Sequence, residues 1–188
     1  APNVRELSER VAQTLVEQIE HLNQIASEFS QFANIGNPKI EKFNVNDLLE
    51  SVIQLYTTSD ETEIKWNMLD KEIIVNADKT QINRLFTNLI QNALQATPEN
   101  RSSLVKITSS IYENAFALIT ITDNGSGIPE EARSKIFTPN FTTKTSGTGL
   151  GLAMCKGIVE QLKGEIWFET TPGEGTTFYV KFPIVEDN

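Results

Sequence analysis

The first 35 residues carry one uninterrupted amphipathic pattern, and this pattern limits the folds open to the chain more than any other feature. No glycine or proline occurs from Asn3 to Ile35, so the spacing predicts a single long helix that ends at Gly36 and Pro38. Apolar residues recur along it at steps of three and four: Val4, Leu7, Val11, Leu15, Ile19, Leu22, Ile25, Phe29 and Phe32. At about 1.5 Å per residue the helix would extend roughly 45 to 50 Å, more than a small domain needs for its own core.

The apolar stripe of this helix requires a partner to cover it. Either an antiparallel neighbouring helix or the same helix of a second subunit would bury the stripe. We therefore expect residues 1–37 to be a helical unit separate from the rest, and residues 43–186 to form one domain.

The rest of the chain has a mixed pattern, which predicts an α+β fold. Asn46 or Asp47 is suited to cap the first helix of this part, and Asp78 is suited to cap the second. A short turn at Glu113 and Asn114 predicts a hairpin. Helical spacing covers residues 48–56, 79–97, 130–137 and 151–163. Strand patterns cover residues 63–69, 72–76, 104–112, 116–122, 165–169 and 176–182.

Charge and cysteine content exclude several classes of protein. The net charge is −9, and the sequence lacks the clusters of Lys and Arg that a nucleic-acid-binding surface needs. A nucleotide remains an acceptable ligand, because a metal ion, helix ends and one or two cations suffice to neutralise its phosphates. The single Cys155 cannot form an internal disulfide, and no apolar run reaches the roughly 20 residues of a membrane span. We therefore expect a reducing compartment.

A glycine-rich stretch runs directly into the last predicted helix. Three glycines occupy alternate positions of the segment Gly147–Gly151, just before helical spacing resumes at Leu152. Glycine allows the backbone to approach a ligand closely, and the unpaired N–H groups of a first helical turn attract anions. The stretch is a candidate site for a polyphosphate, although a flexible loop would have the same composition.

Two asparagines lie four positions apart on the predicted helix over residues 79–97. Asn88 and Asn92 therefore point from the same face of that helix, away from its apolar residues. Amide oxygens suit Mg²⁺, which takes one or two protein ligands beside the phosphates of a nucleotide. The alternative is that both side chains are simply exposed.

A carboxylate and a lysine complete the set of candidate polar residues. Asp123 opens a turn with Gly125 and Gly127, and if buried it would accept a proton from the exocyclic amino group of adenine. An ordinary Asp-x-Gly turn is the alternative. Lys144 lies in a loop rich in Thr, Ser and Gly, as either the cation of a closing lid or a solvated surface residue.

Other catalytic motifs are absent from the sequence. It contains no Gly-Lys-Ser or Gly-Lys-Thr of a Walker A loop, no His-Arg-Asp or Asp-Phe-Gly, and no Gly-x-Ser-x-Gly elbow. A single histidine and a single cysteine also argue against a zinc site or a Cys–His nucleophile pair.

The order of the remaining motifs is specific. The sequence from Phe43 to Ile184 resembles the N, G1, F, G2 and G3 boxes of the ATP-binding domain of sensor histidine kinases, within the wider family of gyrase B, Hsp90 and MutL. The boxes are Asn88-x-x-x-Asn92-Ala93, Asp123-x-Gly125-x-Gly127-Ile128, Phe137 to Lys144, Gly147 to Gly151, and Gly173-x-Gly175-Thr176. The resemblance implies an α/β sandwich, the Bergerat ATP-binding fold, with ATP and Mg²⁺ held between helices and a lid.

The resemblance also gives each matching residue a role. Asn92 would be the Mg²⁺ ligand, Asp123 would read adenine, and Asn88 and Lys144 would serve catalysis near the phosphates. The nucleotide-binding set is Asn88, Asn92, Asp123, Gly125, Gly127, Ile128, Lys144, Gly147, Thr148, Gly149, Leu150, Gly151 and Thr176. Two positions depart from the family pattern: Gln95 stands where a lysine is common, and Asn140 stands where the first aromatic residue of a Pro-Phe-Phe run is usual.

The long N-terminal helix resembles the second helix of the dimeric hairpin that precedes the ATP domain in these kinases. The first helix of that hairpin carries the phosphorylated histidine, followed by an acidic residue and then by a proline. His21 has neither neighbour, since Leu22 follows it and no proline is near. We therefore expect the phosphoacceptor histidine to lie outside this sequence.

The function implied by the resemblance is that of a protein-histidine kinase in a two-component system. The parent protein would transfer the γ-phosphoryl group of ATP to a histidine, which passes it to an aspartate of a response regulator. Expected partners are the phosphoacceptor helix of the same protein, the receiver domain of the regulator, and a second copy joined through the N-terminal helix, with no nucleic acid. The expected location is cytoplasmic, with any anchoring to the bacterial inner membrane through other parts of the parent. A nucleotide-gated regulatory module without phosphotransfer and a plain scaffold without nucleotide are the alternatives.

Overall fold

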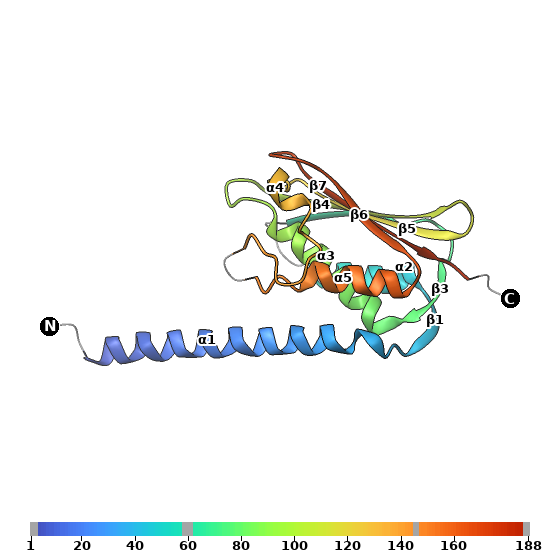
Figure 1. Ribbon diagram of the computed structural model, residues 1–188. Coiled ribbons are helices and arrows are strands. Elements are labelled where there is room, and N and C mark those ends of the chain that lie inside the picture. Colours follow the sequence, from blue (N-terminus) through green and yellow to red (C-terminus); the bar gives the residue numbers. More distant parts are fainter. Residues whose placement is uncertain (1–3, 58–61, 145–146, 186–188) are drawn as a thin grey trace.

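The computed structural model describes residues 4–57, 62–144 and 147–185. Helix α1 (Val4–Ala33) is continuous, as its apolar spacing predicts, and the 3₁₀ turn η1 (Asn34–Gly36) follows it. The rest of the chain lies beside the C-terminal part of α1, and the N-terminal part of α1 projects beyond it (Figure 1). His21 falls within α1, but its side chain is outside the described set. In the described ranges no helix combines the length and apolarity that crossing a membrane requires.

After η1, the described residues form one large and one small sheet. The large sheet has the strand order β2-β4-β5-β7-β6, with β2 parallel to β4 and the other pairs antiparallel. Its strands are β2 (Thr62–Asn67), β4 (Ser103–Tyr112), β5 (Phe116–Asp123), β7 (Gly175–Pro183) and β6 (Glu165–Thr171). The small sheet pairs β1 (Ile40–Asn44) with β3 (Ile74–Asp78) in antiparallel register.

Helices α2 (Val45–Gln54), α3 (Lys79–Gln95) and α5 (Gly151–Gln161) cover one face of the large sheet (Figure 1). Between β5 and α5 lies the single turn of α4 (Glu130–Arg133). The core fills the space between helices and sheet, and its largest fully buried side chains come from both layers: Phe86, Phe182, Leu49, Ile53, Ile73, Ile82, Leu85, Leu89, Ile90, Ile107, Ile119 and Ile121. This arrangement confirms the predicted α/β sandwich.

Side-chain caps fix where α2 and α3 begin. Asp78 caps α3 as predicted, since its carboxylate accepts a hydrogen bond from the backbone N–H of Gln81 at 3.0 Å. The prediction for α2 was wrong, because Asn44 holds the cap position instead of Asn46 or Asp47. Asn46 lies within the helix, and its buried amide group donates to carbonyl groups of the loop after β2.

Two further elements differ from the prediction, and one agrees with it. The sequence pattern gave no sign of β1, whose five residues become a strand by pairing with β3. The helix predicted over residues 130–137 ends at Arg133, and turns follow it. The predicted hairpin joins β4 to β5, with Glu113 and Asn114 at φ values of 51° and 56° that suit a primed turn.

The turn η1 fastens α1 to the rest of the chain. The carbonyl group of Ile35 accepts a hydrogen bond from the side-chain amide of Gln81 on α3 at 3.1 Å and another from Gln161 on α5 at 2.7 Å. The backbone N–H of Lys39 donates to the Asp78 carboxylate at 2.6 Å. The end of α1 is therefore held by the two helices that border the site described below.

We predict that Gly175→Ala destabilises the protein more than Gly173→Ala. Both glycines have positive φ, +132° and +83°, but a methyl group at position 175 would collide with the backbone carbonyl of Asp123, whereas one at position 173 would meet open space. Urea denaturation should show a loss of about 1 kcal/mol in the free energy of unfolding for Gly173→Ala and about 3 kcal/mol or more for Gly175→Ala. Equal losses would contradict the expected collision.

Candidate functional site

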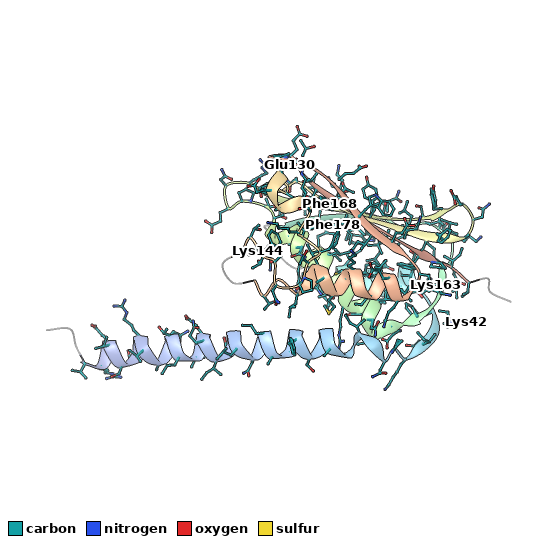
Figure 2. All side chains as sticks on the ribbon, in the orientation of Figure 1. Lys42, Glu130, Lys144, Lys163, Phe168 and Phe178 are labelled. Atoms are coloured by element: carbon teal, nitrogen blue, oxygen red, sulfur yellow. The ribbon has the colours of Figure 1, made fainter. Side chains whose placement is uncertain are left out.

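A cavity of about 510 Å³ opens between α3, the start of α5, and the ends of β5 and β7. Part of its wall comes from the loop before α5, which we call the lid segment (residues 138–144 and 147–150) and on which Figure 2 labels Lys144. All of the predicted nucleotide-binding residues line this cavity except Gly125 and Leu150. Folding thus brings together positions that are far apart in the sequence.

Asp123 is the buried acid of the cavity. It is 5% exposed, and its Oδ1 accepts hydrogen bonds from the backbone N–H groups of Gly125 at 2.8 Å and Thr176 at 3.2 Å. Because both bonds end on Oδ1, the second carboxylate oxygen is the acceptor that a ligand would meet. Burial raises the pKa of Asp123 above its usual value, although the two backbone donors and the charge of Lys144 oppose the shift.

A close approach between two backbone segments fixes the turn after Asp123. An ideal Cβ at Gly125 would lie 2.5 Å from the carbonyl oxygen of Ala96, so a larger residue would displace the turn. Ser126 donates its backbone N–H to the same carbonyl at 3.0 Å. Gly125 therefore acts from behind the cavity, as a spacer between the turn and the end of α3.

Arg101, which belongs to none of the predicted motifs, also supports this turn. Its Nη1 donates to the backbone carbonyl of Asn124 at 2.6 Å and to that of Gly173 at 3.3 Å, which joins the turn after β5 to the turn between β6 and β7. No local pattern marks such a residue, because its acceptors are backbone atoms 23 and 72 positions away.

Asn88 and Asn92 both face the cavity from α3, as their spacing predicts. The Oδ1 atom of Asn92 accepts a hydrogen bond from Lys144 Nζ at 2.9 Å. Asn88 donates through Nδ2 to the carbonyl of Arg84 at 3.2 Å, and its Oδ1 would lie 2.8 Å from an ideal Cβ at Gly151. Asn92 thus bonds α3 to the lid segment, and Asn88 lies next to the start of α5.

Lys144 is the one Lys or Arg among the described residues that line the cavity. Its Nζ donates to Asn92 Oδ1 and, at 2.8 Å, to Gln95 Oε1. Partial burial lowers the pKa of Lys144, and the nearby Asp123 opposes the shift. Because both acceptors are neutral amides, the ammonium charge stays available to an anionic ligand.

Helix α5 begins at the edge of the cavity. Leu150 is its N-cap residue and gives no side-chain hydrogen bond, so the side chain of the cap leaves the first-turn N–H groups of the helix to a ligand. Leu150 itself packs inward and is 6% exposed. Gly149 has a φ of 71°, and an ideal Cβ there would lie 2.6 Å from the backbone nitrogen of Phe141. Only glycine suits this contact between the two ends of the lid segment.

The backbone conformation at position 140 explains why an asparagine stands there in place of the usual aromatic residue. Asn140 has a φ of 63°, a left-handed conformation that asparagine adopts more readily than an aromatic residue does. In this conformation its backbone N–H donates to the carbonyl of Gly149 at 3.0 Å and closes the lid segment on itself.

The side-chain oxygens of the cavity suit a hard divalent cation that binds together with another ligand. The amide oxygens of Asn92 and Gln95 already accept hydrogen bonds from a cation, the ammonium group of Lys144. In the described part of the chain no group of three or more His, Cys, Asp or Glu residues could hold a metal ion by itself. This sparse set of neutral oxygens fits Mg²⁺, which keeps several waters and takes few protein ligands beside substrate phosphates.

Comparison with known proteins gives a consistent result. The family model described as "Histidine kinase-, DNA gyrase B-, and HSP90-like ATPase" matches residues 77–186. Sensor histidine kinase ZraS of Escherichia coli (strain K12) is 32% identical over 178 residues, which are 93% of this chain and 38% of ZraS. The chain thus spans less than half the length of this relative.

Two solved structures of one histidine kinase resemble the chain. The catalytic domain of histidine kinase ThkA is 37% identical, with a TM-score of 0.67, and the match covers 77% of this chain and 95% of that domain. Histidine kinase ThkA in complex with response regulator protein TrrA is 28% identical, with a TM-score of 0.74 over 92% of this chain and 50% of that chain.

We predict that Asp123→Asn removes most of the affinity for ATP. The asparagine oxygen would keep the bonds from Gly125 and Thr176, and its amino group would then face the amino group of adenine, donor against donor. Calorimetry should detect a loss of about 10- to 100-fold or more. The exposed Asp70→Asn is the matched control and should bind ATP as the parent chain does. Unchanged affinity in Asp123→Asn would contradict this role.

Proposed function

Since this chain belongs to the family of histidine kinase-, DNA gyrase B- and HSP90-like ATPases and carries the ATP-binding catalytic domain of a sensor histidine kinase, we propose that it supplies ATP for phosphorylation of a histidine on a separate helix. One observation carries the proposal. A single cavity combines a buried carboxylate suited to adenine with a lysine and an uncapped helix start suited to phosphates.

Asp123 would orient the base. Its free carboxylate oxygen accepts the exocyclic amino proton of adenine, whereas guanine presents a carbonyl oxygen at that place and would meet the carboxylate acceptor against acceptor. Thr176 and Gly125 keep the other oxygen occupied, so the carboxylate cannot turn away from the base. The expected preference is for ATP over GTP.

The phosphates would lie between Lys144 and the first turn of α5. The ammonium group and the N–H groups of that turn supply positive charge, and Asn88 faces the same turn. Mg²⁺, when bound at Asn92, neutralises further phosphate charge. Phosphoryl transfer needs positioning and charge neutralisation more than covalent help from this domain.

The nucleophile would come from another helix. Among the described residues that line the cavity there is no histidine. The exposed apolar stripe of α1 supports its role as one helix of a dimeric hairpin, because Leu7, Leu15 and Leu22 are each more than half exposed and need a partner to cover them. The complex of ThkA with a response regulator supports a receiver domain as the final phosphate acceptor. The cytoplasmic location stays a prediction.

The second candidate is a nucleotide-gated module that binds ATP and changes a partner surface without phosphotransfer. The contact between Lys144 and α3 favours it as well, since a ligand at that point would alter the lid segment whether or not a phosphoryl group moves.

We predict that the chain binds Mg·ATP, does not phosphorylate itself, and labels a supplied hairpin helix. The helix should carry a histidine followed by an acidic residue, and the readout is transfer of radiolabel from [γ-³²P]ATP. A variant of that helix with alanine in place of the histidine is the control. Intact ATP binding without any transfer would favour the gated module, and absence of ATP binding would exclude both candidates.

We also predict that α1 mediates self-association. Leu15 is 58% exposed in the middle of the apolar stripe, so Leu15→Glu would place a charge in the helix contact. Light scattering coupled to size-exclusion chromatography should find the parent chain as a dimer and Leu15→Glu mainly as a monomer. The polar-face variant Gln13→Glu should remain dimeric. A monomeric parent chain would argue against association through α1.

A further inference from the structure

The ammonium group of Lys144 has two acceptors on α3, and the function proposed above uses only one of them. Lys144 Nζ donates to Asn92 Oδ1 at 2.9 Å and to Gln95 Oε1 at 2.8 Å. We propose that Gln95 is a positioning residue for phosphoryl transfer, which holds the ammonium group of Lys144 at the place where the terminal phosphates of ATP bind. This inference rests on the proposed function and adds a residue to it.

Glutamine is suited to hold an ammonium group at the place where phosphates bind. Its amide oxygen accepts a hydrogen bond from an ammonium group without cancelling the positive charge, so Lys144 can still attract a phosphate. A lysine at position 95 would repel Lys144, and a glutamate would neutralise it and repel the phosphates. The departure from the lysine that is common at this position therefore matches the presence of a cation on the lid segment.

Helix α3 holds the backbone of Gln95 in a fixed position. Gln95 is the last residue of α3 and lies three positions after Asn92, so the two side chains share one face of the helix. The opposite face, with Leu89 and Ala93, is almost completely buried. The orientation of Gln95 toward the cavity is thus set by the core.

Lys144 has no such support from secondary structure. It lies outside any helix or strand, and its backbone N–H donates to Thr142 Oγ1 at 3.0 Å within the same loop. A long lysine side chain loses up to about 2 kcal/mol of rotamer entropy when it is held in one geometry. Two acceptors on a rigid helix offset part of that loss before ATP arrives.

Gln95 also allows Asn92 to change partners. A divalent ion on Asn92 Oδ1 would repel an ammonium group bonded to the same oxygen. The second acceptor, 2.8 Å from Nζ, would then keep Lys144 in the cavity beside the phosphates. Lys144 would then lose its hydrogen bond to Asn92, keep the one to Gln95, and stay in the site.

Calorimetry of nucleotide binding to the whole chain tests the proposal. We expect Gln95→Leu to weaken binding of Mg·ATP about tenfold and to leave the affinity for AMP unchanged, since AMP lacks the terminal phosphates that Lys144 contacts. Gln95→Glu should weaken binding of Mg·ATP at least as much, because it keeps an acceptor but adds a negative charge. Gln54→Leu is the matched control, since Gln54 is likewise the exposed last residue of a helix, α2, but does not line the cavity.

A double-mutant cycle separates positioning from a general effect on the fold. If Gln95 acts through Lys144, adding Gln95→Leu to Lys144→Met should cause no further loss of affinity for Mg·ATP. Losses that multiply, an equal loss for AMP and ATP, or an unchanged affinity in Gln95→Leu would each overturn the proposal while the parent chain still binds ATP. A parent chain that binds no adenine nucleotide would overturn the proposed function together with this inference.

Discussion

Burial of one face of α3 is the constraint on which the site depends. Ile82, Leu85, Phe86, Leu89 and Ile90 are fully buried between the sheet and the neighbouring helices, and each such side chain contributes about 1.5 to 3 kcal/mol through removal from water. Because this face cannot turn, the opposite face of α3 must point its amides toward α5 and the lid segment. The polar chemistry of the cavity is thus oriented by apolar contacts on the other side of the same helix.

The parts of the fold that could be predicted from sequence are those with a strong local signal. The apolar spacing of α3 and the short turn at Glu113 and Asn114 each predict an element without reference to distant residues, and the glycine segment marks where α5 begins. The cap of α2 was missed because Asn44, Asn46 and Asp47 are chemically equivalent as caps, and only tertiary hydrogen bonds distinguish them. Strand β1 was missed for a similar reason, since it exists through its pairing with β3.

The candidate site divides in the same way. The family order of motifs located the residues that line the cavity, but it could not reveal which side chains touch. Lys144 reaches Gln95 across 49 positions of sequence, and Arg101 reaches Gly173 across 72. Such contacts form only when the whole domain has folded. The glutamine at position 95, where a lysine is common, is therefore explained only by its hydrogen bond with Lys144. The net charge of −9 is compatible with a polyphosphate ligand, because Lys144 lines the cavity and the N–H groups at the start of α5 lie at its edge.

The carbonyl group of Ile35 has a mechanical consequence. Gln81 of α3 and Gln161 of α5 both hold this one atom, and the same two helices border the cavity at their other ends. Any tilt of α1 relative to α3 and α5 would therefore pivot at Ile35. Because α1 is about 45 Å long, a tilt of roughly 10° would displace its far end by about 8 Å. If the angle between α3 and α5 changed and α1 followed, the far end of α1 would move further than the length of the two hydrogen bonds that hold Ile35.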